Sequence, residues 1–272
     1  MTTTEEKRSA FRALHADGCF VIPNPWDVGS ARMLQHLGFK ALASTSAGFA
    51  WTIGQPDYRV SRAAALAHLA LLSAAVDVPV NADFESGFAA TPEGVAESVQ
   101  LAIEAGVSGL SIEDRDLERG RLYDTAIALE RLRAARAAIV DSLADVLLVA
   151  RTEILLIEPD EITRAIDSLV AFANAGADCL YAPGVRKRED IAAMARAVAP
   201  KSLNVLAIDP TMTLAELADL GVRRISIGGA LARVGWAATV AAAKELRDGS
   251  FTPLAGGMPS KELNGVFAGF PA

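Results

Sequence analysis

Short apolar runs alternate with longer amphipathic runs along most of the chain. The short runs are rich in β-branched and other apolar residues, a composition that predicts strands. They are Cys19–Ile22, Ala41–Ser44, Pro79–Ala82, Gly109–Ile112, Val146–Ala150, Asp178–Tyr181, Leu203–Ala207 and Arg224–Ile227. The longer runs are rich in Ala, Leu and Arg and predict helices. They include Gly29–Leu37, Ser61–Ala75, Pro92–Ala105, Ala128–Ser142, Pro159–Ala175 and Leu214–Leu220.

Several predicted helices end in a glycine turn that leads directly into the next strand. The turns read LGFKAL, AGVSGL, AGADCL and LGVRRI. Glycine at this place is typical of a helix C-cap, because it adopts the left-handed conformation without strain. Eight strand–helix units in about 250 residues predict a parallel (β/α)₈ TIM barrel, with an open doubly wound sheet as the weaker alternative.

The barrel is expected to span residues 1–247, and residues 248–272 to form a C-terminal loop and helix. This last segment carries a small set of apolar side chains at helical spacing, Leu263, Val266, Phe267 and Phe270. Apolar side chains of this kind need a surface to cover. We therefore expect the segment to pack on a neighbouring subunit.

Composition narrows the classes of partner and location. Of the 272 residues, 51% are hydrophobic, which is enough for one large well-buried domain. The net charge of -7 disfavours nucleic acid and anionic membrane as partners. No apolar run approaches the ~20 residues of a membrane span, and the charged N-terminal segment does not resemble a signal peptide. Cys19 and Cys179 lie in apolar runs and are read as reduced core residues. A cytoplasmic protein is expected.

Oxygen-bearing and charged side chains gather where the predicted strands end. Asn81, Asp83 and Glu85 follow the third strand, Glu113 and Asp114 the fourth, and Arg151 and Glu153 the fifth. Asn24 and Asp27 follow the first strand, and Ser44, Thr45 and Ser46 the second. In parallel barrels all these strand ends open at one mouth, where reactive groups are found. The sequence therefore predicts one acidic site containing an arginine.

The chemistry of this site favours a hard cation. Oxygen ligands from Asp, Glu and Asn suit Mg²⁺, with Mn²⁺ as an alternative, whereas zinc prefers histidine or cysteine. Arg151 beside such a metal indicates an anionic ligand. Metal and arginine together would stabilise an enolate formed from a 2-oxo acid. The competing interpretation is an internal salt-bridge network that binds no metal.

One further motif, RRISIGGALARVGW, places two glycines between the eighth strand and a helix. In many barrels backbone N–H groups bind phosphate at this place. Close packing of the helix on its strand explains the glycines equally well, and both interpretations stay open.

Taken together, the motifs resemble the isocitrate lyase/phosphoenolpyruvate mutase superfamily. They are IPNPWDVGSAR, STSAGF followed by GQPD, VNADFESGF, GLSIEDRD, VARTE, GADCLYAPG and RRISIGGALAR, in the order found in that family. The resemblance implies a barrel whose eighth helix is swapped between subunits, giving homodimers or homotetramers. It also implies Mg²⁺ and a small 2-oxo or hydroxy carboxylate as substrate.

The resemblance also implies roles for individual residues. Asp83 resembles the acid nearest the metal, with Asn81, Glu85 and Glu113 holding the waters of the metal. Asn81 departs from the usual aspartate, which predicts weaker metal affinity. The catalytic residues implied are Arg151, which contacts the 2-oxo acid, together with Asp57 and Glu113. The substrate-binding residues implied are Trp26, Thr45, Ser46, Ala47 and Arg151.

The loop after the fourth strand departs from the well-characterised branches. Isocitrate and methylisocitrate lyases carry Lys-Lys-Cys-Gly-His there, whereas this chain reads EDRDLERGRLYD. The position of Arg119 resembles that of the loop lysine in the mutase branch, but the asparagine of that branch is absent. Tyr123 is the only ordinary proton donor of the loop.

The expected activity is that of a Mg²⁺-dependent carbon–carbon lyase, decarboxylase or hydrolase. Its expected substrate is an oxaloacetate-like or 2-alkylmalate-like 2-oxo dicarboxylate, attacked through a metal-stabilised enolate. The alternatives are a P–C bond enzyme acting on phosphonopyruvate and a catalytically silent 2-oxo-acid binding protein.

Overall fold

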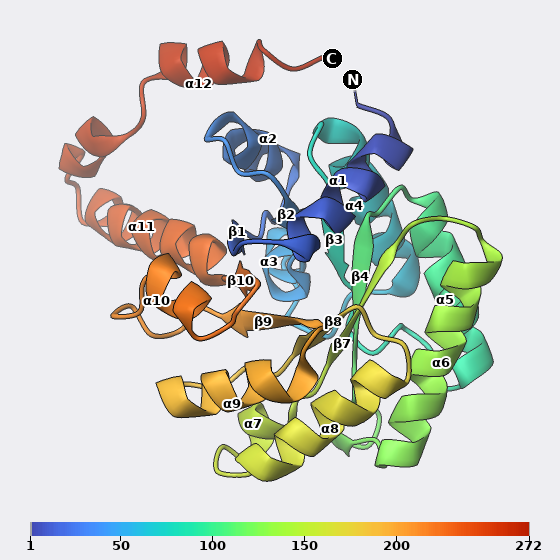
Figure 1. Ribbon diagram of the computed structural model, residues 1–272. Coiled ribbons are helices and arrows are strands. Elements are labelled where there is room, and N and C mark those ends of the chain that lie inside the picture. Colours follow the sequence, from blue (N-terminus) through green and yellow to red (C-terminus); the bar gives the residue numbers. More distant parts are fainter. Residues whose placement is uncertain (1, 272) are drawn as a thin grey trace.

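Eight parallel strands form the centre of the molecule in the computed structural model, which describes residues 2–271 (Figure 1). They are β1 (Phe20–Ile22), β2 (Leu42–Ala43), β3 (Val80–Asp83), β4 (Gly109–Glu113), β7 (Leu147–Arg151), β8 (Cys179–Tyr181), β9 (Ser202–Leu206) and β10 (Arg224–Ser226). The sheet order is β1-β10-β9-β8-β7-β4-β3-β2, so each strand lies beside its neighbour in the chain. The remaining gap between β1 and β2 is bridged where Ala43 N donates to Pro23 O at 3.0 Å. The predicted (β/α)₈ barrel is confirmed.

Helices surround the strands and join them. They are α1 (Thr4–Ala16), α2 (Val28–His36), α3 (Ser46–Thr52), α4 (Arg62–Ala75), α5 (Pro92–Glu104), α6 (Thr125–Asp141), α7 (Ile154–Ile157), α8 (Ile162–Asn174), α9 (Arg188–Val198), α10 (Leu214–Asp219), α11 (Ala230–Arg247) and α12 (Ser260–Phe267), with a 3₁₀ turn η1 (Thr252–Gly256). The glycines that were expected to end helices have positive φ, for example Gly106 (87°) and Gly176 (104°). None of the helices within residues 2–271 has both the length and the apolar character of a membrane span.

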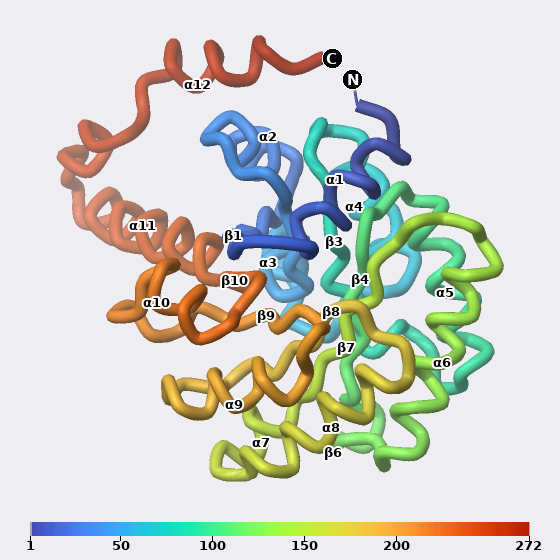
Figure 2. Tube along the Cα trace, viewed as in Figure 1, coloured from blue at the N-terminus to red at the C-terminus, as the bar shows by residue number. Residues whose placement is uncertain are grey.

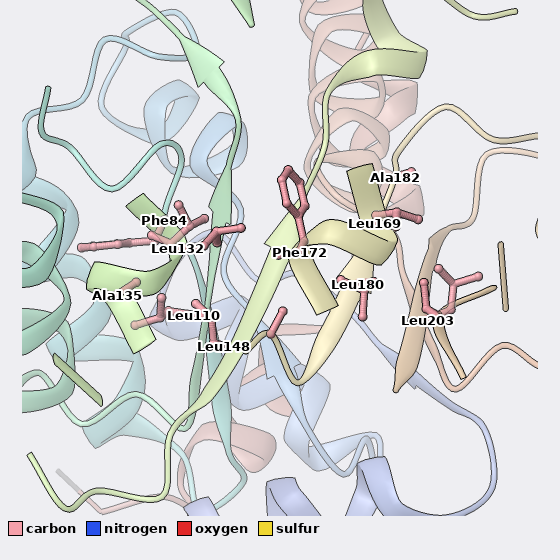
Figure 3. Close-up of a cluster of buried hydrophobic side chains, with 14 of the residues drawn as sticks. Phe84, Leu110, Leu132, Ala135, Leu148, Leu169, Phe172, Leu180, Ala182 and Leu203 are labelled. Atoms are coloured by element: carbon pink, nitrogen blue, oxygen red, sulfur yellow. The ribbon is translucent and has the colours of Figure 1, made fainter. Parts of the chain in front are cut away.

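The largest hydrophobic cluster lies between the outer faces of the strands and the helices that cover them. Figure 3 shows Phe84, Leu110 and Leu148 from the strand layer facing Leu132 of α6 and Phe172 of α8. All of these side chains are buried. Because the barrel strands β3, β4, β7, β8 and β9 all contribute to this layer, they are held in a fixed register and their last residues are set side by side.

Helix α1 closes the N-terminal end of the barrel. Its Phe11 is fully buried in a cluster with Ile22 and Leu147. A Cβ at Gly109 would lie 2.6 Å from the Phe11 ring, so this strand position needs glycine. Two buried cations of α1 are held by backbone carbonyls alone. Lys7 Nζ donates to Ser73 O and Val76 O at the end of α4, and Arg8 donates to Ile103 O and Val107 O at the end of α5.

A small antiparallel hairpin follows β4 at the opposite end. It consists of β5 (Arg115–Asp116) and β6 (Arg121–Leu122), with Gly120 at φ 65° in the turn. This hairpin occupies the EDRDLERGRLYD loop. Its strands are too short for a hydrophobic alternation, so the sequence pattern did not predict them.

The chain leaves the barrel along α11. Figures 1 and 2 show α11 running outward, followed by η1 and by α12, which returns toward α2. Arg32 of α2 donates to Pro271 O at 2.9 Å and lies over the Phe270 ring. Within one chain the C-terminal segment therefore contacts its own α2. Its expected packing on a neighbouring subunit stays a prediction.

An open apolar groove lies where α11 leaves the barrel. The groove has a volume of about 930 Å³ and is lined by Trp51, Val234, Trp236 and Val240, with Arg233 at its edge. Trp236 is 50% exposed and Val234 is 65% exposed. Ala232 is the only buried residue of α11, within the described chain.

Candidate active site

Three neighbouring strands end in charged residues that meet at the barrel mouth. Asp83, Glu113 and Arg151 are the last residues of β3, β4 and β7, and Glu113 lies directly opposite Arg151 in the sheet register. Arg151 contacts Glu153 (Nε to Oε1, 2.5 Å), Glu113 (Nε to Oε2, 3.4 Å) and Asp83 (Nη1 to Oδ1, 3.4 Å). The structure thus brings the expected acids and the expected arginine into one cluster.

Asp83 is oriented by the segment after β2. Its Oδ2 accepts from both the backbone N and the hydroxyl of Ser46 at 3.0 Å, and its own N–H donates to Ser44 Oγ at 2.9 Å. Ser46 begins α3, for which Thr45 is the N-cap and accepts from Gly48 N. The carboxylate of Asp83 is therefore fixed on one side and faces Arg151 on the other.

The remaining expected substrate residues surround this segment. Trp26 packs against Gly48, where an added Cβ would lie 3.0 Å from Trp26 Cβ. Ala47 follows Ser46 on the first turn of α3 and faces Gly229. Both are partly buried. Asp57 is also partly buried, and its Oδ1 accepts from the N–H of Tyr58 at 3.0 Å.

Glu85 is placed by a strained loop. Glu85 (φ 47°) and Phe88 (φ 52°) are both in the left-handed region, which non-glycine residues rarely adopt. The fully buried Arg131 holds this loop by donating to Ser86 O, Ala89 O and Ala90 O. Strain of this kind persists only where surrounding structure over-determines it, and it is common at functional sites.

Burial shifts the pKa of the acids in the cluster upward. Burial, with Asp83 and Asp57 nearby, raises the pKa of Glu85 to about 8. Burial also raises the pKa of Glu113 well above its usual range, although Arg151 opposes this. The pKa of Asp57 is raised by burial and by Asp83. The acids outnumber Arg151 and the more distant Arg115, which lies 3.9 Å from Glu153, so the site favours a further cation.

Three buried carboxylate oxygens of the cluster have no hydrogen-bond partner within residues 2–271. They are Glu85 Oε1, Glu113 Oε1 and Glu153 Oε2. The described residues nevertheless contain no group of three His, Cys, Asp or Glu side chains close enough to hold a metal by themselves. Both observations fit Mg²⁺, which is usually bound through one or two carboxylates and several waters rather than in an all-protein cage.

Asn81 does not join the carboxylates. It shares a face of β3 with Asp83, and the sequence therefore suggested a common site. Two residues along a strand correspond to about 7 Å, which places Asn81 one layer deeper in the barrel. There Asn81 Oδ1 lies 3.4 Å from Arg224 Nη1, while Arg224 Nε donates to Asn204 Oδ1 at 2.8 Å. Asn81 is a partner of a buried arginine.

The loop after β1 is hydrogen-bonded to the loop after β10. Asn24 Oδ1 accepts from Ile227 N and Gly228 N at 2.9 Å each. A Cβ at Gly229 would lie 3.1 Å from the Trp51 ring. Asp27 accepts from Ser30 N as the N-cap of α2. These contacts favour the packing interpretation of the two glycines.

Asp114 is buried beneath the cluster and supports it. It accepts from Thr152 Oγ1 at 2.7 Å and from Glu153 N at 2.8 Å. Burial raises the pKa of Asp114 to about 6. Because it binds the two residues after Arg151, it fixes the direction in which β7 delivers Arg151 and Glu153.

Sequence reasoning missed Tyr58 and Arg115. Tyr58 has φ 61°, and the guanidinium carbon of Arg115 lies 5.3 Å from the centre of its ring. Burial, together with Glu113 and Glu153, raises the pKa of Tyr58. Tyr123, which the sequence offered as the proton donor of the loop, instead lies against Arg131 at 4.3 Å. The only signal in the sequence was that each residue directly follows an acid of the predicted mouth, Tyr58 after Asp57 and Arg115 after Asp114.

Comparison with known proteins agrees with this geometry. A family model for phosphoenolpyruvate phosphomutase matches residues 11–247. The crystal structure of a Burkholderia cenocepacia protein, described as a candidate lyase or mutase, is 45% identical with a TM-score of 0.93, covering 97% of both chains. An oxaloacetate decarboxylase of Paraburkholderia xenovorans is 29% identical over 98% of this chain and 91% of its own length.

A third match is the structure of an oxaloacetate acetylhydrolase in complex with the product oxalate. It is 29% identical with a TM-score of 0.87, and the match covers 98% of this chain and 95% of that one. The family match spans the barrel from α1 to the end of α11 and includes every strand end that builds the acidic cluster. The chain belongs to the isocitrate lyase/phosphoenolpyruvate mutase superfamily.

Proposed function

We propose that this protein is a Mg²⁺-dependent enzyme that breaks a carbon–carbon bond in a small dicarboxylate, either a 2-oxo acid of the oxaloacetate type or a 2-hydroxy acid of the 2-alkylmalate type. The observation that carries the proposal is the cluster at the barrel mouth. One arginine there contacts three acids, and one carboxylate oxygen each of Glu113 and Glu153 is buried without a hydrogen-bond partner among residues 2–271. The proteins named oxaloacetate decarboxylase and oxaloacetate acetylhydrolase among the relatives support oxaloacetate as the first substrate to test.

The acids have distinct roles in this proposal. Asp83 would hold Mg²⁺ directly, and Glu85 and Glu113 would hold its waters. When bound, Mg²⁺ supplies positive charge that stabilises negative charge developing on a substrate oxygen. It would also lower the raised pKa values of Glu85 and Glu113, because a nearby cation favours the charged carboxylate.

The arginine and the α3 segment would orient the substrate. Arg151 Nε donates to Glu153, and Arg151 Nη1 donates to Asp83. Its planar guanidinium can grip a carboxylate or enolate oxygen with the remaining N–H groups. Thr45, Ser46 and Ala47 form the turn beside Asp83, and Trp26 packs behind it, so the substrate carboxylate would lie between this turn and Arg151.

The surroundings of the cluster limit the access of water. The side chains of Glu113 and Glu153 are 1% and 0% exposed. Asp57 borders the cluster on the β2 side and has a raised pKa, so with Glu113 it is the candidate to hold a proton during turnover. In oxaloacetate the C3–C4 bond would break, carbon dioxide would leave, and the enolate of pyruvate would take a proton on C3. In a 2-alkylmalate the 2-hydroxyl would lose its proton, the C2–C3 bond would break to give a 2-oxo acid, and the carbanion left on C3 would take a proton.

The assembly proposed for the enzyme is a homodimer or homotetramer with exchanged α11 helices. The support is the apolar groove beside α11, whose lining residues Val234, Trp236 and Val240 are largely exposed in the single chain. An apolar surface of this size on a helix that leaves the barrel is typical of a subunit interface.

A substrate panel tests the proposed activity. Purified protein with Mg²⁺ is assayed against oxaloacetate, 2,3-dimethylmalate and phosphonopyruvate, and oxalate binding is measured by calorimetry. We expect turnover of a 2-oxo dicarboxylate or 2-alkylmalate that EDTA abolishes. Turnover of phosphonopyruvate alone would identify a P–C bond enzyme. Tight oxalate binding without turnover of any compound would identify a binding protein.

Asp83→Ala tests the metal assignment. We expect it to abolish Mg²⁺ binding in calorimetry and to abolish turnover, because it removes the carboxylate that accepts from both the N–H and the hydroxyl of Ser46. Circular dichroism should show an unchanged fold, since Asp83 lies at the mouth and outside the core. Asp219→Ala, which removes an exposed acid of α10, is the matched control. Unchanged Mg²⁺ affinity in the Asp83 variant would refute the assignment.

A further inference from the structure

Arg115 lies at the edge of the acidic cluster and is not accounted for by the roles given above. It is the first residue of β5 and its side chain is 30% exposed. Its guanidinium faces the ring of Tyr58, and its Nη1 lies 3.9 Å from Glu153 Oε2. The residue therefore links the hairpin, the loop after β2 and the end of β7.

The donors of Arg115 are free. Within residues 2–271 its side chain makes no hydrogen bond, because 3.9 Å to Glu153 is an ion-pair distance and too long for one. Among the nearby arginines, Arg119 donates to Asp116 and Arg131 donates to backbone carbonyls, while Arg121 is an exposed residue of β6. A guanidinium presents five N–H donors in a plane. The guanidinium of Arg115 therefore lacks a partner with acceptor oxygens among the described residues.

Arg115 and Arg151 lie on either side of one carboxylate. Glu153 Oε1 contacts Arg151 and Glu153 Oε2 faces Arg115, and the Glu153 side chain is fully buried. The guanidiniums of Arg115 and Arg151 therefore lie close together, because only the carboxylate of Glu153 and its contact with each of them separate the two groups. A four-carbon chain with a carboxylate at each end is long enough to reach both.

We propose that Arg115 binds the carboxylate of the substrate that lies farthest from the 2-oxo group, and so selects dicarboxylates over 2-oxo monocarboxylates. This inference rests on the proposed function. Arg151 and the α3 turn bind the 2-oxo acid end, and Arg115 receives the other end.

The charge balance of the mouth supports this role. A dianion approaching Asp83, Glu113 and Glu153 is repelled unless each of its charges meets a cation. In this proposal Mg²⁺ and Arg151 neutralise negative charge only at the 2-oxo acid end of the substrate. Arg115 is the hairpin arginine that lies against a cluster acid, and its N–H groups are available for the second charge.

Tyr58 holds Arg115 in the orientation that this role needs. The cation–π contact with the Tyr58 ring occupies none of the guanidinium N–H groups with a hydrogen bond, so they stay free for a carboxylate. Tyr58 itself is in the left-handed region at φ 61°, a conformation that non-glycine residues adopt only where the surroundings enforce it. The aromatic ring is therefore a rigid platform for Arg115.

The test compares two ligands that differ only in the distal carboxylate, 3,3-difluorooxaloacetate and 3,3-difluoropyruvate. Their affinities are measured by calorimetry with Mg²⁺ for wild type, Arg115→Gln and Arg115→Lys, with oxalate as a third ligand. We expect Arg115→Gln to weaken difluorooxaloacetate binding by about tenfold or more, the usual value of a hydrogen bond between charged groups. Binding of difluoropyruvate and oxalate should change less than about threefold. Arg115→Lys should lose less, because it keeps the charge.

Arg119→Gln is the matched control, since it removes an arginine of the same hairpin that is already paired with Asp116. With oxaloacetate as substrate, Arg115→Gln should raise KM more than it lowers kcat. Equal losses for difluorooxaloacetate and difluoropyruvate, or no loss for either, would overturn the role of Arg115 while leaving the proposed function intact. Wild-type protein that binds none of the three ligands with Mg²⁺ would overturn both.

Discussion

Arg151 is the residue on which most of the site chemistry depends. It contacts acids from β3 and β4 and from its own strand end, and its side chain is 15% exposed. We expect Arg151→Lys to reduce turnover by ~10²-fold or more, because a lysine keeps the charge and loses the planar pair of donors. Steady-state kinetics measures the loss.

The control for this substitution is Arg136→Lys. Arg136 is another partly buried arginine, paired with Asp178 and bonded to Gly176 O, and it contacts none of the cluster residues. It should lose stability and keep turnover. If Arg151→Lys retains an activity close to wild type, the arginine is only an ion-pair partner of its neighbouring acids.

Single residues were predictable where strand geometry alone places them. Asp83, Glu113 and Arg151 end adjacent parallel strands, so their convergence follows from the fold. Tyr58 and Arg115 meet only because one residue has positive φ and the other begins a hairpin, and neither conformation leaves a pattern in the sequence. Residue periodicity reports the face of a strand and says nothing of depth, so the sequence grouped Asn81 with Asp83, whereas the structure places Asn81 beside Arg224. Its part in holding the waters of a metal stays a prediction.

The hairpin β5–β6 determines which reactions the site can complete. Cleavage of isocitrate or 2-methylisocitrate leaves a succinate-like carbanion that needs a proton donor on this loop. The hairpin has no thiol, Asp116 is paired with Arg119, and Tyr123 lies against Arg131. Cys179 is fully buried in β8, and Cys19 precedes β1.

We therefore expect no useful cleavage of isocitrate or 2-methylisocitrate. Coupled assays for glyoxylate and pyruvate measure the products, with the substrate of the panel that is turned over as the positive control. Release of either product at ~1 s⁻¹ or faster would show that another group protonates the carbanion.

Helix α4 carries a pH-dependent contact with α3. His68 of α4 is buried and stacks on Phe49 of α3 with ring centres 3.8 Å apart, and burial lowers its pKa to about 4. The unfolded chain, with a histidine pKa of about 6.5, then binds more protons than the folded chain at pH 4 to 6.5. Stability should therefore fall as the pH drops through this window, by up to about 3 kcal/mol for this residue.

His68→Phe should reduce this loss, because phenylalanine keeps the stacking and does not titrate. Urea unfolding at pH 7, 5.5 and 4.5 gives the free energy of unfolding of each variant. Some dependence should remain, since burial also lowers the pKa of His15 to about 3. His36→Phe, at an exposed position of α2, is the control. Identical pH slopes for wild type and His68→Phe would contradict the prediction.

Elements with a clear period were predicted to within a few residues. The strands from Pro79 and Gly109 and the helix from Pro92 are examples, since each is bounded by turn residues and lies against the core. Helix α3 was not predicted, because SAGFAWT is too short to show an amphipathic repeat and depends on its Thr45 cap. Helix α7 (Ile154–Ile157) was not predicted either, because four residues are too few to show a repeat.

The whole molecule should be an oligomer at micromolar concentration. Light scattering is expected to give the mass of a dimer or tetramer, because α11 exposes Val234, Trp236 and Val240 beside an open groove. Trp236→Glu combined with Val240→Glu should lower the mass toward the monomer and lower the melting temperature. Lys244→Glu, an exposed change on the same helix, is the control. A stable wild-type monomer would refute the exchange of α11.

The barrel as a whole could be predicted, whereas the path of its C-terminal arm could not. Eight repeats of a strand and a helix leave few other parallel arrangements. Residues 248–272 form no such unit, and their position depends on α11 and on contacts such as that between Arg32 and Pro271. Apolar spacing indicated that this segment covers a surface without indicating which one.

The anchoring of α1 has a consequence for folding during synthesis. Lys7 and Ser73 are 66 residues apart in the chain, and Arg8 and Val107 are 99 residues apart. When α1 leaves the ribosome, the carbonyls that will bind its two cations have not been made. Until those carbonyls are made, the charged groups of Lys7 and Arg8 stay hydrated. Their hydration keeps α1 soluble although the helix also carries the apolar Phe11. Helix α1 is therefore fixed only after the chain as far as Val107 has followed it.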